Sequence, residues 1–229
     1  MKSSAIVVAA IAAALVSGGG VAVAADLVCT AFSSGGTWHN VVVPAGASCT
    51  LNNSRVTGSV TVKEGGTLHV TTSSGLDTTI AGDIKGDGCD SINLENTGSS
   101  GRIVVGGNLT IQNITFTGFS GARGSQSCPP SSPQNVLVGG NVKCTDVAGG
   151  CVFDNVIISG HFECSGDTNG CELEFAAVGK NASLNNNSSA TIVDNSEIGG
   201  DLKCNGNSPA ATGGSNTVAG NKLGQCSGL

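Results

Sequence analysis

A segment of seven residues recurs every twenty residues along the last ninety residues of the chain. Its five copies begin at Val138, Ile158, Val178, Ile198 and Val218. A fixed period of this length indicates stacked structural units. A unit of twenty residues cannot enclose a core alone, so it must bury its apolar face against the copies before and after it. The repeat therefore predicts a solenoid.

The pattern inside each copy indicates short β-strands. The first and fifth positions are apolar, as in Val138 and Val142, whereas the fourth and sixth are polar, as in Asn141 and Lys143. Residues an even number apart lie on one face of a strand. The third position is Gly in four of the five copies, which allows a turn or a close approach of successive backbones. We expect a buried apolar face and a solvated polar face.

The predicted fold is all-β: a single-stranded parallel β-helix (β-solenoid), right-handed, with about 20 residues per coil. Helical repeats need longer units and a different periodicity, and the chain is rich in residues that break helices. Looser copies begin at Val56, Ile80 and Val105, with steps of 24, 25 and then 33 residues. One solenoid domain is therefore expected over residues 26–229, with an insertion loop at about 118–134.

One corner of the solenoid is expected to carry a row of asparagines. Asn135, Asn155 and Asn195 each stand three positions before a copy of the repeat, and Phe175 interrupts the row. Side chains at equivalent positions of stacked coils lie above one another. We therefore expect these asparagines to form a side-chain ladder.

The first 25 residues have the organisation of a secretory signal peptide. Lys2 precedes an apolar run from Ala5 to Val16, and small residues lead to Ala24 and Ala25, where we expect cleavage. The run is shorter than the roughly 20 residues needed to cross a bilayer. We expect a secreted, extracellular protein without membrane insertion.

All ten cysteines follow this leader: Cys29, Cys49, Cys89, Cys128, Cys144, Cys151, Cys164, Cys171, Cys204 and Cys226. An even number in an exported chain favours disulfides, and the spacing lacks the close pairs of zinc sites. A bridge between stacked cysteines of neighbouring coils and a bridge around one corner are both feasible. We favour the pairs Cys29–Cys49, Cys144–Cys151, Cys164–Cys171 and Cys204–Cys226, which leaves Cys89 and Cys128 as the fifth.

Charge argues against nucleic-acid binding. Removal of Lys2 with the leader leaves 9 basic and 16 acidic residues, a formal charge of −7. Nucleic-acid binding usually requires a basic surface that displaces counterions from phosphates. The remaining partner classes are polysaccharides or proteins of the cell surface or the extracellular space.

Three segments carry a family resemblance: Val42 to Cys49, Val60 to Leu68, and the C-terminal end from Cys204 to Cys226. Together they resemble a group of secreted bacterial right-handed parallel β-helix proteins of unknown function. This resemblance covers nearly all of the chain after the leader and implies a fold and a location, but no catalytic residues. The Gly-Asp/Asn-apolar repeats are also similar to those of bactofilins, which are cytoskeletal β-helices. The leader and the cysteines depart from the bactofilin pattern and argue against a cytoplasmic polymer.

Three groups of residues were considered for chemistry. Asp83, Asp87 and Asp90 are a candidate calcium site, although their spacing lacks the pattern of an EF-hand loop. Acid–base chemistry on polysaccharides needs clustered carboxylates, and the chain has no adjacent Asp pair. His39, His69 and His161 are far apart in sequence, and a nucleophile-elbow motif is absent. We therefore expect no cofactor and no catalytic residue.

Two functional hypotheses follow. The first is a disulfide-stapled solenoid with a structural, adhesive or surface-binding role in the bacterial exterior. The alternative is a carbohydrate-active enzyme of the β-helix type, either a polysaccharide lyase or a glycoside hydrolase. Self-assembly through the unpaired strand edges of the terminal coils is a further hypothesis for either protein.

Overall fold

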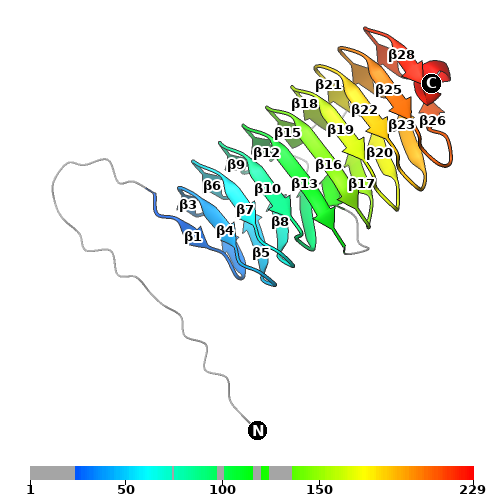
Figure 1. Cartoon of the computed structure of the whole chain (residues 1–229). Helices are drawn as coiled ribbons and strands as arrows, with labels where there is room; N and C mark the ends of the chain where they lie inside the picture. The colour runs from blue at the N-terminus through cyan, green and yellow to red at the C-terminus, as the bar shows by residue number, and fades with distance from the viewer. Residues whose placement is uncertain (1–23, 74, 97–100, 116–119, 124–135) are drawn as a thin grey trace, which may run out of the picture.

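The chain forms a rod of stacked coils (Figure 1). The computed structural model describes residues 24–73, 75–96, 101–115, 120–123 and 136–229. These residues form three parallel sheets, of ten, nine and nine strands, and each coil contributes one strand to each sheet. The predicted parallel β-solenoid is confirmed. The leader lies almost entirely outside the described residues.

The three sheets are named A, B and C in the order in which the chain enters them. Sheet A contains β1 (Leu27–Val28), β4 (Val41–Val43), β7 (Val60–Val62), β10 (Ile84–Asp87), β13 (Leu109–Ile114), β16 (Val142–Val147), β19 (Phe162–Ser165), β22 (Ala182–Asn185), β25 (Leu202–Asn205) and β28 (Lys222–Gly224). Sheet B contains β2 (Phe32–Ser34), β5 (Ser48–Asn52), β8 (Thr67–Thr72), β11 (Ser91–Asn96), β14 (Ser120–Arg123), β17 (Cys151–Asp154), β20 (Cys171–Glu174), β23 (Thr191–Asp194) and β26 (Thr212–Gly214). Sheet C contains β3 (Thr37–Trp38), β6 (Arg55–Val56), β9 (Thr78–Ile80), β12 (Ile103–Val105), β15 (Val136–Val138), β18 (Val156–Ile158), β21 (Ala177–Val178), β24 (Glu197–Ile198) and β27 (Thr217–Val218).

The register follows the twenty-residue repeat. Val142 pairs with Phe162, and Val138 pairs with Ile158. The first and fifth positions of the repeat are buried in the first four copies, as predicted, whereas Val218 and Lys222 of the last copy are partly exposed. Lys143 at the sixth position is exposed. The fourth position differs from the expectation: Asn141 does not lie on a strand face but in the corner between sheets C and A.

Each of two large rings in the core has a small residue opposite it in a neighbouring coil. Phe153 lies opposite Ala122 of the preceding coil, and Phe162 lies opposite Ala182 of the following one. The two phenylalanine rings meet edge to face, with centroids 5.1 Å apart. The small residue beside each ring leaves room for it between coils of constant spacing.

Part of the predicted insertion is a strand. Residues 120–123 form β14, which pairs with β11 and β17 in sheet B. The small residues Ser120, Gly121 and Ala122 gave little strand signal, because β-propensity comes largely from bulky side chains. The rest of the insertion, residues 124–134, lies outside the described residues.

The described residues contain four disulfides, and they are the four pairs favoured from the sequence. Cys144–Cys151 and Cys164–Cys171 each span a corner between sheets A and B, with Cα atoms 6.5 Å apart. Cys29–Cys49 lies at the start of the rod and Cys204–Cys226 at its end. Cys89 is buried and has no disulfide partner among the described residues. Its pairing with Cys128 stays a prediction, because Cys128 lies outside them.

The chain ends in the short 3₁₀ helix η1 (Gln225–Gly228), the one helix among the described residues. None of the described helical structure is long and apolar enough to cross a membrane.

Candidate functional site

One polar side chain per coil forms a ladder along the corner between sheets C and A. An oxygen or nitrogen of each side chain accepts a hydrogen bond from the backbone N–H of the equivalent residue in the next coil. The members of this corner ladder are Asp26, Asn40, Ser59, Asp83, Asn108, Asn141, His161, Asn181, Asp201 and Asn221. The ladder satisfies backbone donors where the chain leaves one sheet for the next, which is a structural role.

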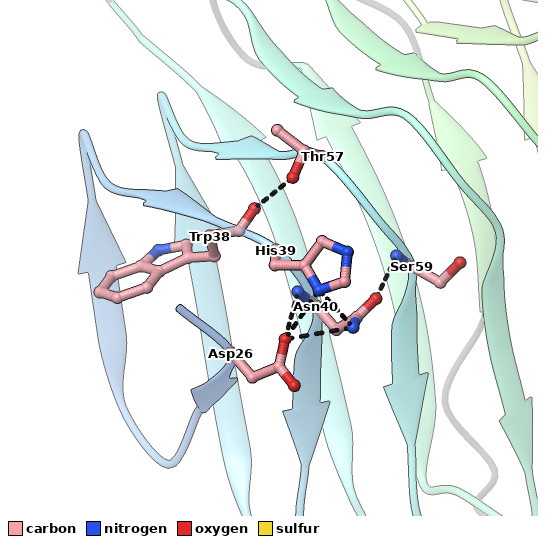
Figure 2. Close-up of polar contacts among 6 residues, drawn as sticks. All are labelled: Asp26, Trp38, His39, Asn40, Thr57 and Ser59. Carbon is pink, nitrogen blue, oxygen red and sulfur yellow. Dashed lines mark hydrogen bonds and ion pairs between the residues drawn. The ribbon is translucent and has the colours of Figure 1, made fainter. Parts of the chain in front are cut away.

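Figure 2 shows the beginning of the corner ladder. The carboxylate of Asp26 accepts hydrogen bonds from the backbone N–H of Asn40 at 3.0 Å and from its side-chain amide at 3.1 Å. Nδ1 of His39 lies 3.2 Å from the same oxygen. The bond from the backbone of Asn40 is the main cause that lowers the pKa of Asp26, and it holds the carboxylate ionised.

The glycine at the third position of the repeat lies beside this ladder. A Cβ on Gly160 would lie 2.5 Å from the carbonyl oxygen of Gly140 in the preceding coil, and one on Gly140 would lie 2.7 Å from that of Gly107. Both separations are too short for a carbon atom. The glycines are therefore required because successive backbones approach closely at this corner.

The expected asparagine row lies at the corner between sheets B and C. Asn155, Phe175 and Asn195 occupy the same position in three coils, with positive φ angles of 54°, 48° and 49°. Asparagine tolerates this conformation better than most residues, which explains its recurrence. At the next position of this corner, Ser196 accepts a hydrogen bond from the backbone N–H of Ala176 at 3.2 Å. Asn135 lies outside the described residues.

A second ladder is buried at the corner between sheets A and B. Asp167 accepts a hydrogen bond from the backbone N–H of Val147 at 2.8 Å, and its own N–H donates to the side chain of Asn187 at 3.0 Å. Asn187 and Asn207 continue the series, which ends at Gln225. We call this the buried ladder. Sequence reasoning missed it, because asparagine is common in turns whether or not its side chain is buried.

Asp167 is the one acidic member of the buried ladder, and it lies between two disulfides. Its Oδ2 is 3.0 Å from Sγ of Cys164, which carries no hydrogen in a disulfide. Burial is the main cause that raises the pKa of Asp167 to about 7. A protonated carboxyl supplies the hydrogen that this contact with sulfur needs.

Asp167 also belongs to both groups of potential metal ligands found among the described residues. The groups are Cys144, Cys151 and Asp167, and Cys164, Asp167 and Cys171, with ligand atoms within 4.8 Å of one another. Metals bind cysteine as the thiolate, and all four sulfurs are joined in disulfides. In this oxidised form the cluster is a structural staple and offers no thiolate ligand.

The calcium candidates do not converge. Asp83 precedes β10 and belongs to the corner ladder, whereas Asp87 ends β10 at the opposite corner. Hydrogen bonds donated by Asn113 and Gln112 lower the pKa of Asp87. Asp90 lies beyond this corner, and its backbone N–H donates to Gly66. A strand of four residues separates the first two carboxylates by on the order of 13 Å, too far to share one ion.

Charged side chains do converge on the outer face of sheet B. Equivalent positions of four successive strands carry Arg123, Asp154, Glu174 and Asp194, each paired in register with the next. Glu172 lies two residues before Glu174 on the same face. We call these five residues the carboxylate row. Sequence reasoning missed the row because the residues that occupy its equivalent positions on successive strands are twenty or more residues apart in the chain, although their constant position in the repeat was a usable signal.

The pKa of Glu174 is raised by its surroundings in this row. Burial raises the pKa of Glu174, and the negative charges of Glu172, Asp154 and Asp194 raise it further, while Arg123 lowers it. Asp154 is only 6% exposed. Neighbouring acids with unequal surroundings are a feature of acid–base sites in glycosidases.

The three histidines lie at separate places. His39 contacts Asp26 at the start of the rod, and Nε2 of His69 lies 3.3 Å from Oε2 of Glu95 on sheet B. His161 is exposed and accepts the backbone N–H of Asn181 within the corner ladder. The structure does not bring these histidines together.

Comparison with protein-family models, curated proteins and solved structures found no match to this chain.

Proposed function

We propose that this protein is an exported scaffold with a structural, adhesive or surface-binding role in the bacterial exterior. The observation that supports it most is the corner ladder, which links every coil from Asp26 to Asn221. The residues that repeat most faithfully thus hold coils together. Three flat sheets present outward side chains at intervals of about 4.8 Å along the rod, which suits contact with an extended surface or polymer.

The leader and the disulfides support the proposed location. Disulfides persist in oxidising compartments and are rare in the cytosol. A charge of −7 after removal of the leader fits a soluble exported protein better than a nucleic-acid-binding one. The resemblance to secreted bacterial β-helix proteins agrees with this assignment.

The location is tested by expressing the full chain with a C-terminal tag in a bacterium and separating cytoplasm, envelope and medium. We expect the tagged chain in the envelope or medium, with a mature N-terminus at Ala25 or Asp26. Mass spectrometry of the non-reduced protein should find the four bridges. A chain that stays in the cytoplasm with its leader intact would contradict the proposal.

The surface-binding role is tested by cosedimentation of the purified protein with isolated bacterial envelopes. One outward, half-buried residue is changed to Lys on each sheet: Thr110 on sheet A, Glu172 on sheet B and Ile157 on sheet C. We expect binding to fall at least fivefold for one face and to stay unchanged for the other two. Equal cosedimentation of all three variants with the unchanged protein would remove support for a binding face.

The second candidate is a carbohydrate-active enzyme, favoured by the carboxylate row. The raised pKa of Glu174 suits a general acid, and Asp154 or Asp194 on the adjacent strands would act as the base or nucleophile. A screen of plant, fungal and bacterial polysaccharides for new reducing ends or unsaturated products tests it. Turnover abolished by Glu174→Gln but kept in Asp201→Asn, which changes the corner ladder instead, would favour the enzyme over the scaffold.

A further inference from the structure

The two ends of the rod differ in what they present beyond the last coil (Figure 1). At the C-terminal end, the core position that is Leu202 in one coil is Lys222 in the next. The Lys222 ammonium donates hydrogen bonds to the carbonyl oxygens of Asn216, at 3.1 Å, and Leu229. Another coil stacked here would have to bury this charge, which is strongly unfavourable.

The C-terminal segment closes the same end further. Cys226 in η1 is fully buried and bonded to Cys204, and Leu229 packs against the core. The side chain of Gln225 accepts from the backbone N–H of Asn207 and donates to its carbonyl oxygen. This end of the rod is therefore capped by its own chain.

The N-terminal end carries apolar side chains where the other end carries a charge. The core position equivalent to Lys222 is occupied by Leu27, and the position equivalent to Val218 by Trp38; both are partly buried against the core. On the outer faces of the same coil, Val28 is 68% exposed and Phe32 is 66% exposed, the highest values among the large apolar residues described. Such a cluster of exposed apolar groups is a feature of interaction surfaces.

The strands of this first coil are also edge strands. β1, β2 and β3 each stand at the end of their sheet and pair with a described strand on one side only. Their outer edges therefore have no strand partner among the described residues, and such edges can pair with strands of another chain. A partner that matches this end must offer three strand edges arranged as the sides of a triangle. It must also have apolar side chains at the centre of that triangle.

We propose that two copies of the chain form a closed dimer through their first coils, N-terminal end to N-terminal end. A second copy offers the required outline only at its two ends, and the capped C-terminal end excludes head-to-tail stacking. The two-fold arrangement places β1, β2 and β3 of one copy against those of the other as antiparallel edges, with Trp38 and Phe32 of both copies at the contact. This arrangement also pairs the exposed strand edges of both first coils with each other, so no further copy can add and the assembly stops at two chains.

This inference refines the hypothesis of self-assembly and does not depend on the surface role proposed above. The dimer places both capped ends outward, which doubles the length of the rod and displays each binding face twice.

The test is the molar mass of the chain from Asp26 to Leu229, which contains every described strand, by light scattering over a concentration series. We expect a dimer that dissociates on dilution. The double substitution Val28→Glu and Phe32→Glu, at exposed positions, should weaken dimerisation at least tenfold. Leu223→Glu, an exposed residue at the opposite end, is the matched control and should leave the dimer unchanged. Circular dichroism checks that all chains are folded.

Cysteine crosslinking determines the orientation. Cysteine is placed in each strand of the first coil in turn, as Val28→Cys, Ser34→Cys or Thr37→Cys. A two-fold axis sets one of these strands against its own copy, so one of the variants should form a covalent dimer by itself on mild oxidation. Thr212→Cys in β26 should not, and the unsubstituted chain provides the background. A monomer at all concentrations, a mass that grows beyond two copies, or a dimer weakened by Leu223→Glu but not by the first-coil substitutions would each overturn the proposal. Crosslinking only when a first-coil cysteine variant is mixed with Thr212→Cys would indicate head-to-tail contact and would also overturn the proposal.

Discussion

Neighbouring coils of this rod follow the same path with and without a disulfide. At equivalent positions, two coils carry Cys144–Cys151 and Cys164–Cys171, and the next carries Leu184 and Thr191. The strands stay in register across all three coils, so the bridge is not needed to shape the corner. Its contribution is to restrict the unfolded chain, while Leu184 supplies only apolar contact.

The buried ladder differs between the same coils. The coil that contains the Cys164–Cys171 bridge has Asp167 at the ladder position. The two following coils have Asn187 and Asn207 there. All three side chains accept a backbone N–H through an oxygen, and only Asp167 can ionise. In the two coils with bridges, the disulfides restrict the unfolded chain. The carboxyl of Asp167 makes the stability of this region depend on pH.

The largest effect is expected from removing both stacked bridges. Replacing Cys144, Cys151, Cys164 and Cys171 with Ala should lower the free energy of unfolding by about 4–8 kcal/mol, at about 2–4 kcal/mol for each bridge. Urea denaturation followed by circular dichroism measures the loss. The control is Val142→Ala, which shortens a buried side chain of the same coil without touching a bridge. A loss no greater than that of this control would show that the bridges contribute little.

The pH difference between the coils is tested with Asp167→Asn. The folded pKa of Asp167 is raised to about 7 from an unfolded value near 3.8, so the folded state holds the proton more tightly. Its contribution is fully present below pH 3.8 and is lost as the pH rises through 7. From pH 4 to pH 8 the unchanged protein should therefore lose about 4 kcal/mol of stability relative to Asp167→Asn.

The matched variant for this prediction is Asn187→Asp, which places an acid at the same ladder position one coil later. We expect it to become less stable as the pH rises, as in the natural chain at Asp167. Melting temperatures between pH 4 and pH 9 report both variants. Parallel pH curves for Asp167→Asn and the unchanged protein would contradict the assignment.

A new bridge in the unstapled coil should raise stability by a smaller amount. The equivalent Cα atoms of the preceding coils are 6.5 Å apart, within the range of disulfides. Leu184→Cys with Thr191→Cys should therefore form a bridge and raise the free energy of unfolding by about 2–3 kcal/mol. The reduced form of the same variant is the control. A bridge confirmed by mass spectrometry without a rise in the urea midpoint would contradict the view that a bridge stabilises the fold by restricting the unfolded chain.

The smallest change concerns the hydroxyl of Thr191. Its Oγ1 is buried and has no hydrogen-bond partner among the described residues. Thr191→Val keeps the shape and removes the unpaired group, so we expect a gain of about 1 kcal/mol, seen as a higher melting temperature. Ser196→Ala is the contrasting variant, because its hydroxyl donates to the carbonyl oxygen of Leu173, at 3.2 Å, and of Asp194, at 2.9 Å. It should lower stability.

The period of the repeat was enough to predict the solenoid and most of its buried positions. Val138 and Val142 are both buried, although they lie on β15 and β16 on either side of a corner and not on one strand face. The period brought Cys144, Cys151, Cys164 and Cys171 together, but it left stacked bridges and corner bridges equally open. The short strand β14 was missed because its residues are small. The row from Arg123 to Asp194 was missed because each carboxylate, read alone, is an ordinary surface residue.

The ladders were also hard to foresee. Asn141 at the fourth position suits a solvated strand face as well as a corner, and sequence alternation does not separate the two. Asp167 stands in a turn-like segment rich in Gly and Asn, where burial is not expected. Their roles depend on which backbone N–H of the neighbouring coil lies within reach, and this is set by the stacking.

The corner ladder gives the rod a fixed spacing from one coil to the next. Each rung bonds only to the rungs beside it, and each one offers a side-chain acceptor to the backbone N–H of the next coil. Deleting residues 162–181 would remove one coil and place Asp201 next to His161 in the ladder. The backbone N–H of Asp201 would then donate to the side chain of His161, which is the kind of bond that links the other coils. The length of such a rod can thus change in whole steps of about 4.8 Å by gain or loss of twenty residues, while its faces and its ends stay the same.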